Sequence, residues 1–118
     1  REDILADATG HIRVHGPELG SGVAANRSLG LIIQGDDGQG GRRGMGTRTS
    51  ARSFGHHGAG GQVAWADPDS GLSFCFLTNG LDANQVRVAR RGPALSDLAA
   101  ACEGVPRGDR SLPASNRV

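Results

Sequence analysis

The sequence predicts an α+β fold with three antiparallel strands and a C-terminal helix, and three features support this prediction. Two strand-like runs, residues 62–66 and 72–79, are joined by a segment rich in turn-forming residues. An earlier apolar run, residues 29–34, is typical of another strand with a buried face. Residues 82–102 then carry a helical pattern, in which the apolar side chains return to one face.

The segment before the hairpin is expected to be mostly irregular. Residues 2–8 predict the end of a helix that closes at Gly10, whereas residues 11–27 are polar and interrupted by glycine and proline. Residues 35–53 are rich in glycine and arginine and predict a long loop without structure of its own. Such a connection within a compact domain is usually functional, mobile or inserted.

The antiparallel hairpin is the clearest element of the sequence. Pro68 presets the φ angle of a turn, Asp67 can accept hydrogen bonds from its own downstream backbone, and Gly71 tolerates positive φ. These three residues therefore predict a tight connection between the two runs.

The second strand of the hairpin carries apolar side chains on both faces. Phe74 and Phe76 share one face because successive side chains alternate, and Cys75 and Leu77 share the other. A strand that is apolar on both sides is typically covered on both sides. We therefore expect residues 72–79 to form a central strand.

The C-terminal part predicts an interrupted helix followed by a tail. Asp82 is expected to cap the helix, and Gly92-Pro93 is expected to interrupt it because proline has no N–H to donate. Residues 94–102 resume the helical pattern. Residues 104–118 have no apolar periodicity and predict a flexible tail.

Composition limits both the stability and the chemistry of the chain. Leu, Ile, Val and Phe make up only 24 of the 118 residues, so a core built from this chain alone would be marginal. The chain has no lysine and no tyrosine, which excludes a lysine base, a Schiff base, a P-loop and a tyrosine acid within it. The net charge of +1 gives no strong attraction to nucleic acids or membranes.

Metal and membrane sites are not predicted. Cys75 and Cys102 lack metal-ligand spacing and are expected to be buried free thiols. His11 and His15 are four residues apart, but the neighbouring glycines argue against the helix that would bring them together. No apolar run reaches the length of a membrane span, and no export signal is visible, so we predict a cytoplasmic protein without cofactor or metal.

One stretch of sequence resembles a known family. Its pattern is a glycine-rich string, an apolar strand that ends in Ala66-Asp67-Pro68, a turn, and a second strand that ends near Asn79. This pattern resembles the third conserved box of class C β-lactamase-like serine hydrolases, especially bacterial esterases of that group. The string itself reads Phe54-Gly55-His56-His57-Gly58-Ala59-Gly60-Gly61.

The resemblance implies a fold and a set of site residues. Residues 1–103 would be the incomplete C-terminal portion of a β-lactamase/transpeptidase-like domain. His56-His57-Gly58 would lie on the edge strand that lines the active-site cleft, where β-lactamases carry Lys-Thr/Ser-Gly. The backbone N–H of Ala59 would be one donor of the oxyanion hole. His56 would donate to the substrate or to the catalytic tyrosine, and His57, Gly58 and Gly60 would bind the substrate.

The remaining boxes of the family cannot lie in this chain. They are Ser-x-x-Lys, which holds the nucleophile and its base, and a tyrosine box, and the chain lacks both lysine and tyrosine. A serine without an adjacent base is inert at neutral pH. The resemblance therefore predicts a fragment of an ester or amide hydrolase that is inactive alone, partnered by a complementing N-terminal chain or by copies of itself.

Several other functions compete with this prediction. The chain could be a non-catalytic interaction remnant or a degenerate gene product. His56-His57 could be a polar pair in a turn, and Trp65 is more typical of a packing anchor than of a ligand platform. The Arg/Gly segment, residues 38–46, could bind single-stranded nucleic acid, but a flexible connection between two strands is the favoured interpretation, and no nucleic-acid partner is predicted.

Overall fold

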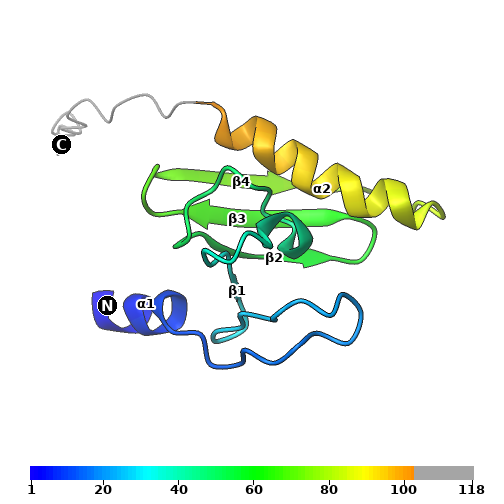
Figure 1. The fold of residues 1–118 in the computed structure, drawn as a ribbon. Coiled ribbons are helices and arrows are strands. Elements are labelled where there is room, and N and C mark those ends of the chain that lie inside the picture. The colour runs from blue at the N-terminus through cyan, green and yellow to red at the C-terminus, as the bar shows by residue number, and fades with distance from the viewer. Residues whose placement is uncertain (103–118) are drawn as a thin grey trace, which may run out of the picture.

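A four-stranded antiparallel sheet with the strand order β1-β2-β3-β4 lies at the centre of this computed structural model, which describes residues 1–102 (Figure 1). The predicted α+β class is therefore confirmed, with one strand more than expected. The predicted tail, residues 104–118, lies outside the described residues. The elements are α1 (Glu2–Gly10), β1 (Ile32–Ile33), the 3₁₀ helix η1 (Gly40–Arg43), β2 (Phe54–Gly58), β3 (Gln62–Asp67), β4 (Leu72–Phe76) and α2 (Gln85–Ala100).

The β3–β4 hairpin forms as the sequence predicts. Trp65 pairs with Phe74 and Val63 with Phe76 across the two strands. The carboxylate of Asp67 accepts a hydrogen bond of 3.0 Å from the N–H of Asp69, and the Asp67 carbonyl accepts one of 2.9 Å from Gly71, whose φ is +73°. The turn-forming residues between the two strands thus determine the strand register.

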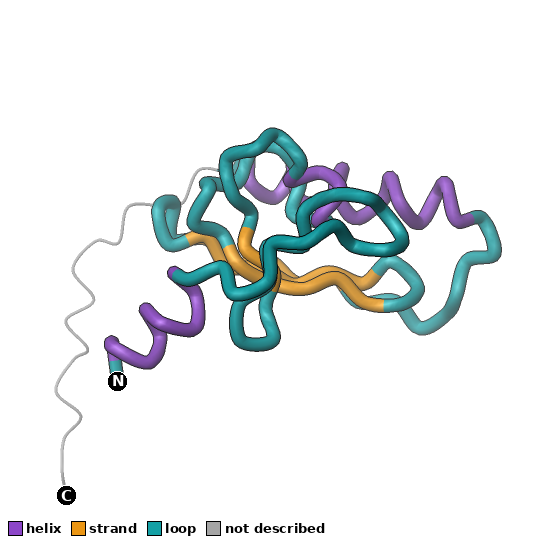
Figure 2. The backbone as a smooth tube through the Cα atoms, turned by 60° about the horizontal axis from the view of Figure 1, so that its bottom comes forward, coloured by secondary structure: helices purple, strands orange, loops and turns teal. Residues whose placement is uncertain are grey.

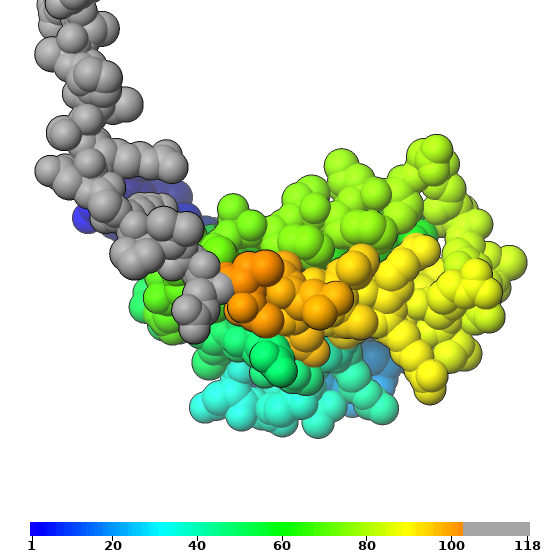
Figure 3. All heavy atoms as spheres, turned by 90° about the horizontal axis from the view of Figure 1, so that it is seen from above, coloured from blue at the N-terminus to red at the C-terminus, as the bar shows by residue number. Residues whose placement is uncertain are grey.

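The core lies between the sheet and α2. Ile32, Met45, Val63 and Trp65 form its buried centre, and Phe74, Phe76 and the end of α2 pack around them. In the view from above, α2 crosses the molecule between β4 and the segment that contains η1 (Figure 3). Figure 2 shows the same helix running along one side of the strands, with α1 at the N-terminus on the other side.

The prediction that residues 72–79 form a central strand is wrong for the described residues. β4 ends at Phe76 and is the outer strand of the sheet within residues 1–102. Phe74 and Phe76 are half-buried toward the core, whereas Ser73 and Cys75 on the opposite face are exposed. The alternation of side chains was predicted correctly, but nothing among the described residues covers the second face.

The predicted interruption of the C-terminal helix is also wrong. α2 continues through Pro93, and its N-cap is Asn84 rather than Asp82; the Asn84 side chain accepts a hydrogen bond of 3.0 Å from the N–H of Arg87. Packing on both sides of the proline explains the continuity. Before it, Arg91 binds the carbonyl of Gly60, and after it Ser96 is fully buried, so both halves of the helix are held on one axis.

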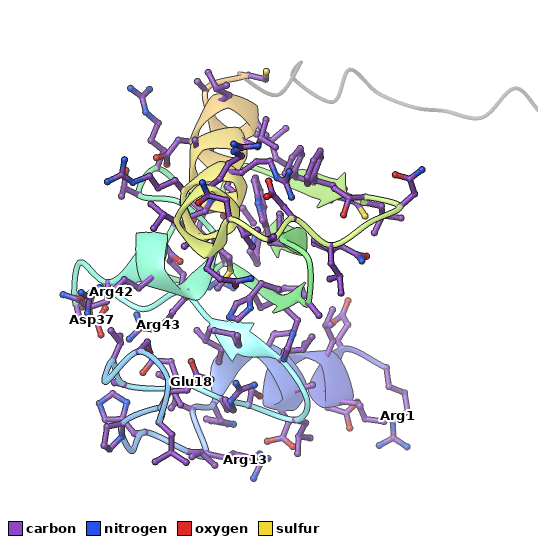
Figure 4. The ribbon with its side chains drawn as sticks, turned by 90° about the vertical axis from the view of Figure 1, so that its right-hand side faces the viewer. Arg1, Arg13, Glu18, Asp37, Arg42 and Arg43 are labelled. Atoms are coloured by element: carbon purple, nitrogen blue, oxygen red, sulfur yellow. The ribbon has the colours of Figure 1, made fainter. Side chains whose placement is uncertain are left out.

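The glycine- and arginine-rich segment, residues 35–53, is ordered rather than structureless. Arg43 is only 4% exposed, and its guanidinium donates to the carbonyls of Ala24 and Gln34 and to the carboxylate of Asp37. Figure 4 shows Asp37, Arg42 and Arg43 gathered at one side of the chain. A buried cation needs such partners, so Arg43 fixes the segment on the preceding loop.

The remaining predictions divide between confirmation and correction. The N-terminal helix extends to Gly10 as predicted, and residues 11–27 are irregular apart from short bridges such as Val14 with Arg27. Cys75 and Cys102 are free, but both are exposed rather than buried. No helix within residues 1–102 has the length and apolar character needed to cross a membrane.

Candidate active site

The open edge of β2 is the first element of the site. β1 has only two residues, and it pairs Ile33 with Phe54 and Ile32 with Gly55. On its other side β2 pairs with β3 along its whole length, from Phe54 to Gly58. Within the described chain, residues 56–58 therefore present a free strand edge. The resemblance predicted an edge strand at this position.

A glycine turn continues this edge. The N–H of Gly61 donates a hydrogen bond of 3.3 Å to the carbonyl of Gly58, which closes a turn with Ala59 and Gly60 at its centre. Gly60 and Gly61 have φ of +83° and +81°, which a residue with a side chain rarely adopts. Ala59 is exposed, and within residues 1–102 its backbone N–H donates no hydrogen bond.

The glycines of the turn differ in what surrounds them. A Cβ at Gly60 would lie 2.9 Å from Leu81, and one at Gly61 would lie 3.0 Å from the Arg91 guanidinium, so the fold itself requires glycine at both positions. A Cβ at Gly58 would meet nothing closer than Gln62, at 3.8 Å. The space beside the Gly58 backbone is therefore not filled by other residues of the described chain.

Arg91 connects the turn to the rest of the structure. Its guanidinium donates a hydrogen bond of 2.8 Å to the carbonyl of Gly60 and lies 5.6 Å from the ring centroid of Phe76. One side chain of α2 thus contacts both the turn and the outer strand. This contact restrains a turn that two glycines would otherwise leave free.

His57 lines a cavity of about 470 Å³ on the α2 side of the sheet. Gly58 and Val63 from the hairpin, and Val88 and Pro93 from α2, contribute apolar and backbone surface to its wall. The half-buried imidazole has a pKa below its usual value, chiefly because burial disfavours the charged ring, and the neighbouring His56 acts in the same direction. A neutral imidazole can donate or accept a hydrogen bond inside this cavity.

His56 lies on the opposite face of β2, because neighbouring residues of a strand alternate. Its ring is exposed and borders an open hollow beside Phe54, Ala64 and Cys75. Its Nε2 atom lies 3.2 Å from the guanidinium of Arg27, which also forms an ion pair with Glu18. Figure 4 places Glu18 on the segment that precedes β1.

The five residues predicted for the site are therefore close in space but divided between two faces. Gly58, Ala59 and Gly60 form the turn at the open edge, His57 lines the cavity on the α2 side, and His56 lies on the other side. Among the residues that the structure describes, no group of three or more histidine, cysteine, aspartate or glutamate side chains could hold a metal ion.

Comparison with known proteins assigns the family. A family model described as Beta-lactamase matches residues 6–99. The chain belongs to the β-lactamase family. Searches of curated proteins and of solved structures gave no match. The match covers β1 to β4 and nearly all of α2, so this β-lactamase-family chain has a serine-hydrolase origin over most of its described length.

Three side chains near the candidate site were not predicted from the sequence. Arg27 and Glu18 come from a segment that was expected to be irregular, and Arg91 comes from a helix whose apolar residues carried the prediction. The contacts of Arg27 with His56 and of Arg91 with Gly60 each span about 30 residues, so no local pattern signals them. The sequence has no lysine, so arginine is the permanently charged cationic side chain of the chain. This composition was the one signal that pointed to arginine contacts near the site.

Proposed function

We propose that this chain supplies the oxyanion-binding edge strand and part of the substrate site of a serine-dependent ester or amide hydrolase of the class C β-lactamase-like, esterase type. The observation that carries the proposal is the N–H of Ala59, which has no partner within residues 1–102 and lies at the end of an open strand edge in a β-lactamase-family chain. A fixed N–H that points to a developing negative charge contributes several kcal/mol to catalysis in a dry site.

The surroundings of Ala59 support this role. The Gly58 carbonyl, which accepts the hydrogen bond from Gly61, belongs to the same planar peptide group as the Ala59 N–H, and Arg91 holds the Gly60 carbonyl on the other side of the turn. A donor that is already oriented need not be reoriented when the oxyanion forms, and this pre-organisation is what makes such donors effective. The open space at Gly58 would let the reacting carbonyl approach the backbone.

The cavity beside His57 supports a role in substrate binding. It adjoins Gly58 and has an apolar wall from Val63, Val88 and Pro93. Such a site suits a small acyl or alkoxy group next to a reacting carbonyl. His57 would contribute a hydrogen bond to it, while His56 and Arg27 would meet a substrate from the other face of the strand.

The nucleophile would come from polypeptide outside these 118 residues. The family's Ser-x-x-Lys and tyrosine boxes need residue types that this sequence lacks. A second copy of the chain cannot supply them, so a complementing N-terminal polypeptide is the required partner. The chain is in this proposal a fragment of the catalytic domain.

The proposal can be tested with the complex of this chain and a family polypeptide that carries both missing boxes. Ala59→Pro removes the N–H, and proline suits the first central position of a turn, which Ala59 occupies. We expect this variant to lower kcat for p-nitrophenyl butyrate by about 10²–10³-fold. The control Ala59→Ser keeps the N–H and should retain the rate within roughly threefold, since the backbone donor is unchanged.

Two results would contradict the proposal. One is an Ala59→Pro complex that is folded by circular dichroism and hydrolyses the ester as fast as the unchanged complex. The other is hydrolysis by the chain alone at a rate that survives His57→Gln, because the chain would then hold a nucleophile and base of its own.

A further inference from the structure

His56 is held by two contacts that involve different ring nitrogens. Its Nδ1 lies 2.5 Å from the backbone carbonyl oxygen of His57, and its Nε2 lies 3.2 Å from Nη1 of Arg27. The first partner is part of β2, whereas the second comes from the segment just before β1. The ring is therefore fixed from both ends although it is exposed to solvent.

The chemistry of the two partners determines where the proton of the ring lies. A carbonyl oxygen only accepts hydrogen bonds, so Nδ1 must carry the hydrogen and donate it. A guanidinium only donates, so Nε2 must offer its lone pair. Both contacts require the same state, the neutral ring with its hydrogen on Nδ1, and each contact reinforces the other.

Arg27 is itself held firmly enough to impose this state. Its guanidinium forms an ion pair with Glu18, and the side chains of both residues are only 35% exposed. Its backbone N–H donates a hydrogen bond of 2.9 Å to the carbonyl of Val14, and its carbonyl accepts one of 2.7 Å from Arg13. The guanidinium approaches His56 from a fixed segment.

We propose that Arg27 is a positioning residue that fixes His56 as the neutral Nδ1–H tautomer and itself supplies a permanent positive charge on this face of the open strand edge. The ring therefore presents no N–H beyond the one that the His57 carbonyl already uses. If β2 lines the cleft of a hydrolase, as the proposed function holds, hydrogen-bond donors on this face come from the guanidinium and not from the imidazole.

The tautomer can be measured in the chain alone, without a partner or turnover. Long-range ¹H–¹⁵N correlation spectra above neutral pH distinguish a protonated from an unprotonated ring nitrogen. We expect the Nδ1–H form of His56 in roughly tenfold excess, as one favourable charge-assisted hydrogen bond would produce. Arg27→Met should reduce this excess several-fold, because the Arg27 donor is lost and only the His57 carbonyl still favours the Nδ1–H form.

A matched variant separates this effect from the loss of any surface arginine. Arg52 forms an exposed ion pair with Asp69, and Arg52→Met should leave the His56 spectrum unchanged. Arg27→Lys keeps a cationic donor and should preserve part of the excess. These readouts do not depend on the oxyanion role of Ala59, so failure here and failure of the proposed function are distinguishable.

The proposal is overturned by an unchanged chain in which His56 carries its hydrogen mainly on Nε2. It is equally overturned by an Arg27→Met chain that keeps the full Nδ1–H excess. If Arg27→Met does not fold, the spectrum of the unchanged chain and the Arg27→Lys comparison still decide between the two tautomers.

Discussion

The indole Nε1 of Trp65 donates a hydrogen bond of 3.0 Å to the hydroxyl of Ser96, and this bond joins the middle of β3 to the inner face of α2. The same hydroxyl donates a bond of 2.9 Å to the carbonyl of Gly44. Ser96 is fully buried, and Trp65 is only 4% exposed. One serine therefore connects the sheet, the helix and the segment after η1 through hydrogen bonds that are buried away from solvent.

Removal of this hydroxyl should destabilise the chain markedly. We expect Ser96→Ala to lower the free energy of unfolding by about 2–6 kcal/mol, because two buried polar groups would each lose a partner at a cost of about 1–3 kcal/mol. Urea denaturation followed by fluorescence measures this directly, since Trp65 is the single tryptophan of the chain. Ser73→Ala, at an exposed position of β4, should change the stability by less than about 0.5 kcal/mol; equal effects of the two changes would contradict the prediction.

The two glycines at the open edge should respond differently to alanine. Gly60→Ala introduces a Cβ 2.9 Å from Leu81 and 3.2 Å from the Gly80 carbonyl, at a φ of +83°. We expect a loss of about 1–3 kcal/mol in the free energy of unfolding, since both the backbone conformation and the space oppose the side chain. Thermal and urea denaturation measure the loss.

Gly58→Ala is the matched control for that change. Its added Cβ meets nothing closer than 3.8 Å, so the stability should fall by about 1 kcal/mol or less. Under the proposed function, Gly58→Ala should by contrast raise KM in the complex with the complementing polypeptide, because the added methyl group narrows the approach to the backbone. A Gly58→Ala chain that is as unstable as Gly60→Ala would show that the space around Gly58 is not free.

The Asp37–Arg43 pair should make the stability depend on pH in acid. The Arg43 guanidinium lowers the pKa of Asp37 from its ordinary value of 3.8 to about 2. Because this pKa is lower in the folded than in the unfolded state, the stabilisation is present above pH 3.8 and is lost as the pH falls toward 2. The Asp37 side chain is 37% exposed although that of Arg43 is only 4% exposed, so we expect the ionised carboxylate to stabilise the fold by only about 1 kcal/mol.

Asp37→Asn tests this dependence. The difference in unfolding free energy between the unchanged chain and this variant should be largest near neutral pH and vanish as the pH approaches 2. Asp69→Asn, which breaks an exposed ion pair with Arg52, should show a smaller difference over the same range. If the difference in unfolding free energy between the unchanged chain and Asp37→Asn grew toward low pH, the pKa of Asp37 could not be lowered in the folded state.

The sequence predicted those parts of the fold whose causes are local. Asp67, Pro68 and Gly71 determine the hairpin turn, and the alternation of Phe74 with its neighbours determines which face of β4 packs. The glycine-rich string after Phe54 predicted an edge strand through resemblance, and within residues 1–102 no strand pairs with the outer edge of residues 56–58.

The parts that could not be predicted depend on contacts between distant residues. Arg43 looks like a surface arginine in a flexible loop until Ala24, Gln34 and Asp37 surround its guanidinium. Pro93 looks like a helix breaker, but the burial of Ser96 one turn later holds the helix together. In the same way His56 and His57 are adjacent in sequence, and the strand geometry shows that their side chains lie on opposite faces of β2.

The proline inside α2 also changes the wall of the cavity beside His57. Pro93 has no N–H to give to the carbonyl of Ala89, one turn earlier, and both residues line that cavity. The Ala89 carbonyl therefore lacks its usual helical N–H donor at the wall of this cavity. A guest that brings a hydroxyl or amide hydrogen to this point would satisfy it, whereas a purely hydrocarbon guest would leave it unmatched.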